Sequence, residues 1–270
     1  MYYGPVLNVQ NAGPGKTALI TPGLGATYDK FILKLAGGLT AADLTAIRIK
    51  ANDEEFFYDT GTNLDKRQAY QGVDTDVAEV CIDFTEPNAR GDAAAQYLAS
   101  LPANLLKKLQ IEVDIADAEG AEEDFSQLTV AAEYRGPTQN RFILKRRPFN
   151  FYAGAAGDHD LLLPSGFSGG IIKRVWLHGA SITAAQLKLG NSIAMDYKAI
   201  AELTRVQERN GLTPQTNIRC LDFVADGNLM GALDTSKQRG VDISLKLTTS
   251  GAVSIAGFID YIDPIDRIRS

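Results

Sequence analysis

An internal repeat is the feature that most restricts the fold of this 270-residue sequence. Three short motifs occur twice, in the same order and at nearly the same spacing. The offsets of 142, 143 and 139 positions separate, respectively, Pro22 from Pro164, Thr40-Ala41-Ala42 from Thr183-Ala184-Ala185, and Cys81-Ile82-Asp83-Phe84 from Cys220-Leu221-Asp222-Phe223. Agreement at three ordered positions indicates that one domain was duplicated in tandem.

The length of the chain agrees with two domains, because each half has roughly 135 residues, near the common domain size. Hydrophobic residues make up 45% of the chain and charged residues 22%, a composition typical of globular domains. A Gly136-Pro137 pair marks the end of the first half. We therefore predict an N-terminal domain at residues 1–140 and a C-terminal domain at residues 141–270.

Short runs rich in β-branched and aromatic residues, separated by turn residues, predict eight strands in the first half. Eight is the number that a jelly roll requires. Helices are predicted at residues 63–70 and at residues 92–100, where Asp92 is the N-cap. The predicted strands are residues 5–9, 16–21, 28–36, 44–50, 54–58, 77–84, 107–115 and 128–134.

The second half repeats this pattern with seven predicted strands and one helix, residues 196–210, which Gly211 ends as a C-cap. The predicted strands are residues 141–145, 160–163, 170–178, 186–190, 217–225, 241–248 and 252–261. The expected fold class is all-β: two tandem eight-stranded jelly rolls, a double jelly roll, with short helices in the connecting loops.

Net charge excludes one class of partner. A net charge of −6 argues against sequence-independent binding to a phosphate backbone, which needs clustered Lys and Arg, and we expect no sequence-specific nucleic-acid binding either. The one basic cluster, Lys145-Arg146-Arg147, is predicted to be a solvated seam between the domains, with a phosphate or lipid headgroup contact as the alternative. No apolar run is long enough to span a membrane, and the N-terminal residues do not have the charged start of a signal peptide. The two cysteines are predicted to be buried, unpaired thiols.

Enzymatic motifs find no support from their context. Gly166-Phe167-Ser168-Gly169-Gly170 fits the nucleophile elbow, but a β-branched run follows it where that motif needs a helix. Gly15-Lys16-Thr17 lacks the earlier glycine of a phosphate-binding loop. Arg90-Gly91-Asp92 matches the integrin-type tripeptide, but a match of three residues is too short to indicate a function. Two histidines, His159 and His178, are too few for the metal sites of paired β-barrel enzymes. We expect no catalytic residue and no required cofactor.

An acidic segment near the end of the first half is compatible with a calcium site, since calcium takes several oxygen ligands. Its first members, Asp114, Asp117 and Glu119, are the candidate ligands. A solvated acidic loop is the commoner arrangement of such residues, and both interpretations stay open.

The order of the motifs, the length of the chain and the duplication of the domain together give the sequence a resemblance to a known family. It resembles the double jelly-roll major capsid proteins of tailless bacteriophages with an internal membrane, of the corticovirus type. The stretches that carry the resemblance are TALITPG at residues 17–23, residues 28–38, YDTGTNL at residues 58–64, Arg146-Arg147-Pro148-Phe149 and residues 161–166.

The resemblance implies a structural protein and no enzyme. Three chains would form a homotrimer with six similar walls, and such capsomers would tile an icosahedral shell around an internal membrane and a DNA genome. The implied partners are the chain itself, a vertex protein and the viral inner membrane. Their positive charge alone suggests that Lys145, Arg146 and Arg147 face the lipid headgroups of that membrane. The protein would assemble in the host cytoplasm and reside in the virion, and some such shells look calcium-dependent.

Two other functions remain open at this point. A carbohydrate-binding or glycan-processing protein built on paired β-sandwiches predicts a monomer with a cleft of aromatic and acidic residues. A trimeric tail or spike adhesin predicts a trimer that forms no hexagonal lattice.

Overall fold

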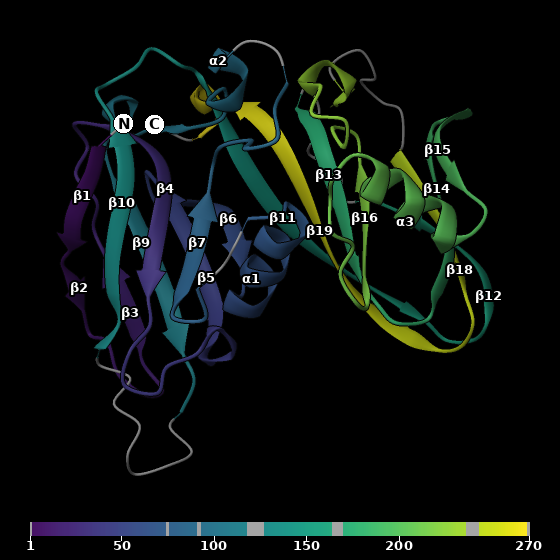
Figure 1. The fold of residues 1–270 in the computed structure, drawn as a ribbon, viewed down its shortest axis with the longest axis horizontal. Helices are drawn as coiled ribbons and strands as arrows, with labels where there is room; N and C mark the ends of the chain where they lie inside the picture. The colour runs from purple at the N-terminus through teal and green to yellow at the C-terminus, as the bar shows by residue number, and fades with distance from the viewer. Residues whose placement is uncertain are drawn as a thin grey trace. The chain divides into compact units, whose positions relative to one another are not determined.

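A computed structural model describes residues 2–73, 76–90, 93–117, 127–163, 170–235 and 243–268 (Figure 1). The chain forms two compact units. The N-terminal unit consists of Met1–Asn88, Asp92–Arg146 and Pro264–Ser270, and the C-terminal unit of Ala89–Gly91 and Arg147–Asp263. The domain limits 1–140 and 141–270 stay a prediction.

The N-terminal unit contains two sheets with the strand pairing of a jelly roll. One has the order β1-β10-β4-β7, with β8 beside β4, and the other runs β2-β3-β9-β5-β6. All eight strands predicted in this half are present. The strands are β1 (Tyr2–Leu7), β2 (Val9–Gln10), β3 (Thr17–Ile20), β4 (Thr27–Lys34), β5 (Leu44–Ala51), β6 (Glu54–Asp59), β7 (Glu79–Asp83), β8 (Leu101–Pro102), β9 (Leu109–Ile115) and β10 (Thr129–Arg135).

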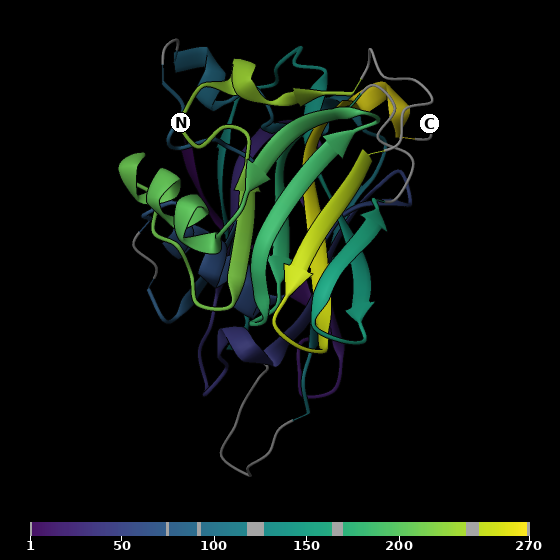
Figure 2. The same cartoon turned by 90° about the vertical axis from the view of Figure 1, so that its right-hand side faces the viewer.

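The C-terminal unit repeats this arrangement (Figure 2). Its sheets have the orders β11-β19-β13-β16, with β17 beside β13, and β12-β18-β14-β15. Apart from β2, which has no counterpart among the described strands, replacing each strand of one unit by its counterpart in chain order gives the sheets of the other. The strands are β11 (Phe142–Ala153), β12 (Gly157–Leu162), β13 (Ile171–His178), β14 (Ile182–Leu189), β15 (Ser192–Tyr197), β16 (Ile218–Asp222), β17 (Leu233–Asp234), β18 (Ile243–Thr249) and β19 (Val253–Pro264).

The helices also correspond. Helix α1 (Gly61–Tyr70) joins β6 to β7, and helix α3 (Ile200–Arg209) joins β15 to β16. Gly72 and Gly211 follow these helices with φ angles of 70° and 79°, which favour glycine. The remaining helices are short: α2 (Ala93–Gln96), η1 (Ala41–Asp43), η2 (Ala103–Leu105), η4 (Leu229–Gly231) and η5 (Ile265–Arg267). None of the helices in the described ranges is long and apolar enough to cross a membrane.

Three details of the sequence prediction were wrong. The helix predicted at residues 196–210 begins only at Ile200, because Asp196 and Tyr197 end strand β15, which was not predicted. The helix predicted at residues 92–100 is shorter, and its proposed N-cap Asp92 lies outside the described residues. The Thr-Ala-Ala motifs are not equivalent, since Ala41 opens the short helix η1 whereas Ala184 lies inside β14.

Each unit has its own apolar core. In the N-terminal unit Phe84 makes edge contacts with Phe31 of β4 and Phe57 of β6, so these rings join the two sheets. In the C-terminal unit the core includes Val175 of β13 and Leu247 of β18. Strand β9 alternates between buried and half-buried residues along its whole length, as its sequence predicts.

Candidate assembly surfaces

The first candidate surface lies on the face of sheet β1-β10-β4-β7 that is turned away from the core, which we call the β4 face. Because Phe31 and Leu33 point into the core, Lys30, Ile32 and Lys34 point outward from β4. The register places Lys30 between Glu133 of β10 and Asp83 of β7. The outward residues therefore begin with an acid-base-acid row across three strands.

The charges of this row support one another. Lys30 Nζ lies 3.1 Å from Asp83 Oδ2. Burial alone lowers the pKa of Lys30, but the attraction of Asp83, with a smaller contribution from Glu133, outweighs it and the pKa is raised. Burial raises the pKa of Glu133, and Lys30 partly offsets this effect. The row is half-buried.

The C-terminal unit has the same row on the matching face of sheet β11-β19-β13-β16, which we call the β13 face. Here Arg174 of β13 lies between Asp260 of β19 and Asp222 of β16. Arg174 Nε lies 2.9 Å from Asp222 Oδ2, and Trp176 Nε1 donates a hydrogen bond of 2.7 Å to Asp260 Oδ2. All of these residues are buried.

A second row repeats as well. On the β4 face Ile32 lies between Ala131 and Cys81, and on the β13 face Trp176 lies between Phe258 and Cys220. The N-terminal row thus has the smaller side chains. Neither cysteine forms a disulfide bond, and Cys220 is buried whereas Cys81 is half-buried.

A glutamine from the preceding helix contacts each cysteine strand. Gln207 of α3 donates a hydrogen bond of 2.7 Å from Nε2 to the Cys220 carbonyl oxygen. Burial raises the pKa of the Cys81 thiol, and a hydrogen bond with Gln68 of α1 acts in the opposite direction. Gln68 and Gln207 are 139 positions apart, the offset of the two cysteines.

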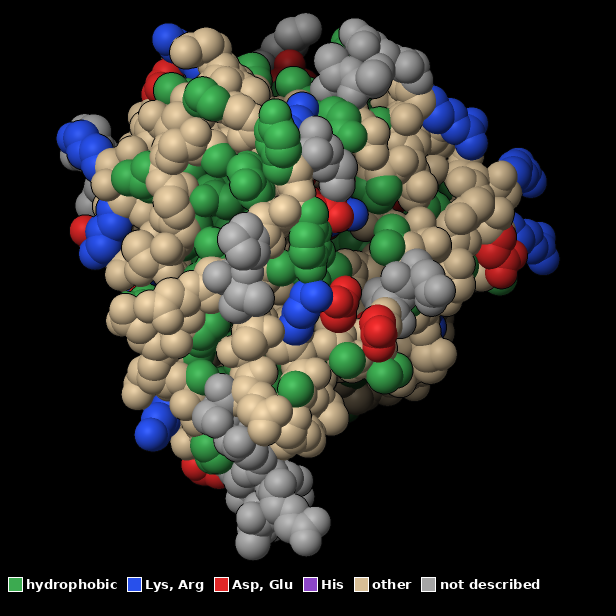
Figure 3. Space-filling view, turned by 60° about the vertical axis from the view of Figure 1, so that its left-hand side comes forward, with side chains coloured by type: hydrophobic (Ala, Val, Ile, Leu, Met, Phe, Trp, Pro, Cys, Tyr) green, Lys and Arg blue, Asp and Glu red, His purple; other side chains and the backbone are tan. Residues whose placement is uncertain are grey.

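The second candidate surface is the edge formed by β1. Tyr2 and Tyr3 are 63% and 60% exposed, and hydrophobic side chains gather on the side of the molecule where β1 and β10 lie (Figure 3). A cavity of about 410 Å³ opens here, lined mainly by small residues and by Tyr28 and Tyr134. Tyr28 donates a hydrogen bond of 2.8 Å to the Gly23 carbonyl oxygen. Exposed aromatic side chains on an unpaired edge strand are typical of surfaces that contact another protein.

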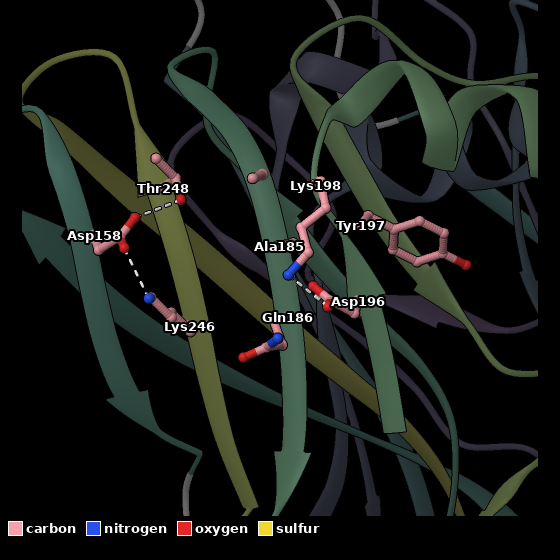
Figure 4. Close-up of a pocket in the computed structure, with 9 residues that line it drawn as sticks. Asp158, Ala185, Gln186, Asp196, Tyr197, Lys198, Lys246 and Thr248 are labelled. Atoms are coloured by element: carbon pink, nitrogen blue, oxygen red, sulfur yellow. Dashed lines mark hydrogen bonds and ion pairs between the residues drawn. The ribbon is translucent and has the colours of Figure 1, made fainter. Parts of the chain in front are cut away.

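The remaining sheet of each unit carries charges on its outer face. In the N-terminal unit Arg48 of β5 contacts Asp114 and Glu112 of β9 and Glu55 of β6. In the C-terminal unit the ion pairs are separate: Asp158 with Lys246 at 2.7 Å, and Asp196 with Lys198 at 2.7 Å. Gln186 lies between the two pairs, in a hollow of about 190 Å³ (Figure 4).

The predicted calcium ligands do not come together as a metal site in the part of the chain that is described. Asp114 forms an ion pair with Arg48 and accepts a hydrogen bond of 2.7 Å from the Thr17 hydroxyl. These interactions lower the pKa of Asp114, the hydrogen bond from Arg48 most of all. Asp117 is exposed, and Glu119 lies outside the described residues. Nowhere in the described ranges do three His, Cys, Asp or Glu side chains come together so that they could hold a metal ion.

The basic cluster is not a solvated patch. Lys145 and Arg146 are buried, and only Arg147 is exposed. Arg146 Nη1 lies 2.5 Å from Asp59 Oδ2, and its guanidinium group stacks on Phe57 at 4.6 Å. The expectation that all three residues face solvent or lipid headgroups was therefore wrong, because a buried carboxylate at the end of β6 holds Arg146 inside.

The weighed motifs have structural roles where they are described. Thr17 begins strand β3 directly after Gly15-Lys16, so no helix follows this glycine. Arg90 donates its backbone N–H to the Gly227 carbonyl oxygen at 2.8 Å. His178 packs edge-on against Phe258 with ring centroids 5.4 Å apart. Ser168 lies outside the described residues.

Sequence reasoning found the cysteine motif but missed the rows that contain it. Glu133 and Asp260 belong to strands that no motif connects, so only the pairing of β10 with β4 and of β19 with β13 reveals them. The signal that was available is the shared offset of Gln68-Gly72-Cys81 and Gln207-Gly211-Cys220.

Two jelly rolls with matching strand orders, and matching rows on their sheets, define a double jelly roll, an architecture found among viral capsid proteins. The family model for the viral coat protein P2 N-terminal domain matches residues 3–135, and that for the viral coat protein P2 C-terminal domain matches residues 143–265. The chain belongs to the viral coat protein P2 family. This membership supports the capsid role and not the carbohydrate-binding alternative.

Solved structures agree with the fold. The major capsid protein P2 from bacteriophage PM2 is 19% identical, with a TM-score of 0.90 and coverage of 98% of each chain. The STIV major capsid protein is 12% identical, with a TM-score of 0.71 and coverage of 96% of each chain. The Faustovirus major capsid protein is 7% identical, with a TM-score of 0.60 and coverage of 97% of this chain and 89% of that one. No curated protein matches the sequence.

Proposed function

We propose that this coat protein works as a homotrimer whose three chains form a capsomer with a pseudo-hexagonal outline. The observation that carries the proposal is the presence of two jelly rolls with the same strand order in one chain. Three such chains around a threefold axis present six similar walls, so a trimer fits a hexagonal lattice while keeping closed symmetry. Obligate contacts of this kind bury on the order of 2,000 Å² or more.

Capsomers of this form tile an icosahedral shell, and the resemblance extends the proposal to a shell around an internal membrane and a DNA genome. The net charge of −6 suits a wall that does not bind the genome directly. A vertex protein and the inner membrane are the proposed partners beyond the chain itself. Assembly takes place in the host cytoplasm, and the role is structural without catalysis. Calcium binding by Asp114, Asp117 and Glu119 remains a separate proposal.

Native mass spectrometry of the purified chain tests the trimer. One chain has a mass of 29.1 kDa, so the expected species has three times that mass, about 87 kDa. Negative-stain electron microscopy then distinguishes a capsomer from a trimeric adhesin, because only the capsomer shows a hexagonal outline and two-dimensional lattices. A stable monomer at high protein concentration contradicts the proposal.

A further inference from the structure

The cavity beside β1 and β10 has the size and the lining of a small-molecule site. Its volume of about 410 Å³ lies within the range of roughly 300–1,000 Å³ that is usual for ligand pockets. Of its nine described lining residues five are glycine or alanine, and none is charged. Two of them, Ala132 and Tyr134, lie two positions apart on β10, and Ala132 pairs with the core residue Phe31. The cavity therefore lies on the side of the sheet that carries the core.

Aromatic rings in mutual contact form one wall of this cavity. The Tyr134 ring lies 5.8 Å from the Tyr2 ring and 6.2 Å from the Tyr28 ring, and Tyr28 lies 4.7 Å from Phe31, all between ring centroids. Glycine at position 4 lets β1 pass close to Tyr134, because a Cβ at Gly4 would lie only 2.5 Å from Tyr134 Cε1. The wall is thus held in place by its neighbours, and a flat ring can stack against it.

The Tyr28 hydroxyl provides a hydrogen-bond acceptor in the cavity. Burial raises the pKa of Tyr28, so the hydroxyl keeps its proton, and it donates this proton to the Gly23 carbonyl oxygen at 2.8 Å. Tyr28 and Gly23 both line the cavity. A hydroxyl has one proton and two lone pairs, so only the lone pairs remain for a ligand. A molecule that contacts this hydroxyl must therefore donate the hydrogen bond.

Isoleucine takes the place of Tyr28 in the C-terminal unit. There Ile172 of β13 pairs with Tyr261 of β19, just as Tyr28 pairs with Tyr134, and each pair lies beside a shift in strand register. Ile172 is fully buried within the core of its unit. The shared fold therefore does not require a hydroxyl at this position.

The lining determines the class of ligand. A charged molecule would lose hydration without meeting an opposite charge in the cavity. We propose that the cavity binds a small, uncharged aromatic molecule that donates one hydrogen bond, from an N–H or O–H group, to the Tyr28 hydroxyl. Its ring lies against the tyrosine wall, and the glycines and alanines leave room for its edges. The site belongs to the N-terminal unit, so this inference does not rest on the proposed trimer.

Indole and benzofuran test the proposal, because the two molecules have the same shape and only indole has an N–H donor. Equilibrium dialysis against the full-length chain measures the affinity and the number of molecules bound per chain. We expect saturable binding of one indole per chain, and weaker binding of benzofuran by about 3- to 10-fold, the contribution of one hydrogen bond. No saturable binding of indole, or equal binding of the two molecules, overturns the proposal without any variant.

Tyr28→Phe tests the acceptor, since it removes the hydroxyl and keeps the ring. The preference for indole over benzofuran should disappear in this variant. Tyr134→Phe is the matched control, because it removes the hydroxyl of a neighbouring ring in the same wall, and the preference should persist. A preference that survives Tyr28→Phe, or one that Tyr134→Phe removes, overturns the assignment of Tyr28 as the acceptor.

Gly25→Leu tests the location of the bound molecule. Gly25 lines the cavity, a Cβ there meets no atom within 4 Å, and its φ angle is not positive. Leucine should occupy part of the space and weaken the binding of both probes on the order of 10-fold. Gly251→Leu makes the same change at a glycine of the C-terminal unit with equally open surroundings, and should leave both affinities unchanged. Equal affinities in Gly25→Leu and the wild type would mean that indole binds elsewhere, which overturns the proposal.

Discussion

The β4 face and the β13 face are corresponding surfaces of the two duplicated domains, and they differ in solvent exposure. Both have an acid-base-acid row, with a cysteine in the next row and a glutamine from the preceding helix beside it. The base is Lys30 where solvent reaches the row and Arg174 where it does not. A guanidinium group has several donors in a fixed plane and is less strongly hydrated than an ammonium group, so it is the better cation for a fully buried row.

The change from lysine to arginine at counterpart positions therefore accompanies a large difference in solvent exposure. The aspartates have kept the same local role, because Asp83 Oδ1 accepts a 2.8 Å hydrogen bond from the Thr85 backbone N–H and Asp222 Oδ1 accepts one of 2.9 Å from the Val224 N–H. Each aspartate thus ends its strand in the same way. What differs is the cost of removing its charge.

The largest effect is expected for Asp222→Asn compared with Asp83→Asn. Asparagine keeps the acceptor for the backbone N–H but removes the negative charge. Breaking a buried ion pair costs about 3–5 kcal/mol, whereas a partly exposed pair contributes about 1 kcal/mol or less. Urea unfolding followed by the emission of Trp176, the only tryptophan, reports on the C-terminal unit. Reactivity of the Cys81 thiol reports on the N-terminal unit.

Equal destabilisation by the two substitutions would break this comparison. It would mean that solvent does not weaken the Lys30–Asp83 pair relative to the buried one. Thr183→Ala, at an exposed residue of β14, is a suitable control because the Thr183 hydroxyl makes only a 3.1 Å hydrogen bond to the Thr248 carbonyl oxygen.

The glutamines give the next effect. Gln207→Ala removes a buried donor from the Cys220 carbonyl oxygen and should cost about 1–3 kcal/mol in the C-terminal unit. Gln68→Ala removes the hydrogen bond that lowers the pKa of Cys81, so that pKa should rise further and the thiol should react more slowly near neutral pH. A Cys220→Ser background leaves Cys81 as the only thiol. Unchanged labelling of Cys81 would argue against an equivalent role for Gln68.

The sequence was sufficient to predict the fold because strand patterns and repeats are local signals. The alternation in residues 109–115 and the cysteine motifs identified strands that the structure places in counterpart positions. The missed strand β15 is mostly exposed, so its sequence does not show the alternation of a half-buried strand. Its end, Asp196-Tyr197, was assigned instead to the helix that follows.

Most of the candidate surface was beyond sequence reasoning for a different reason. Lys30 and Glu133 are about 100 positions apart, and only the register of β4 with β10 makes them neighbours. The burial of Arg146 was likewise unpredictable, because Asp59 lies in a distant strand. In both cases a charge is paired through tertiary structure that no local pattern reports.

The C-terminal ends of α1 and α3 can be compared directly, although the expected changes in stability are smaller. Gly72 and Gly211 both have positive φ angles, and Leu212 N–H donates to the Gln207 carbonyl oxygen at 3.0 Å just as Val73 N–H donates to that of Gln68 at 3.1 Å. Replacing either glycine by alanine should cost about 1 kcal/mol through backbone strain. Gly251→Ala, with open space around it and no positive φ, is the control and should change stability little. Clearly unequal costs would indicate that the two helix ends are not equivalent.

The smallest effect concerns the pH dependence of stability at the charged face around Arg48. There Arg48 contacts three carboxylates, whereas the corresponding sheet of the C-terminal unit has two separate ion pairs. The hydrogen bond from Arg48 holds the pKa of Asp114 below its ordinary value of 3.8. Asp114 therefore stabilises the fold above that pH, and this contribution is lost as the pH falls through the lowered pKa. Asp114→Asn should cost under about 1 kcal/mol near neutral pH and nothing at sufficiently low pH.

Glu55 should behave in the opposite sense although it belongs to the same network. Burial raises its pKa, and the attraction of Arg48 only partly offsets this, so the Glu55 contribution is most favourable at low pH and is lost as the pH rises through the raised pKa. Glu55→Gln should therefore remove the loss of stability that Glu55 causes as the pH rises. Thermal melting followed by circular dichroism from about pH 7 to about pH 3 measures both variants. The same sign of change in Asp114→Asn and Glu55→Gln would show that burial, rather than Arg48, dominates the whole network.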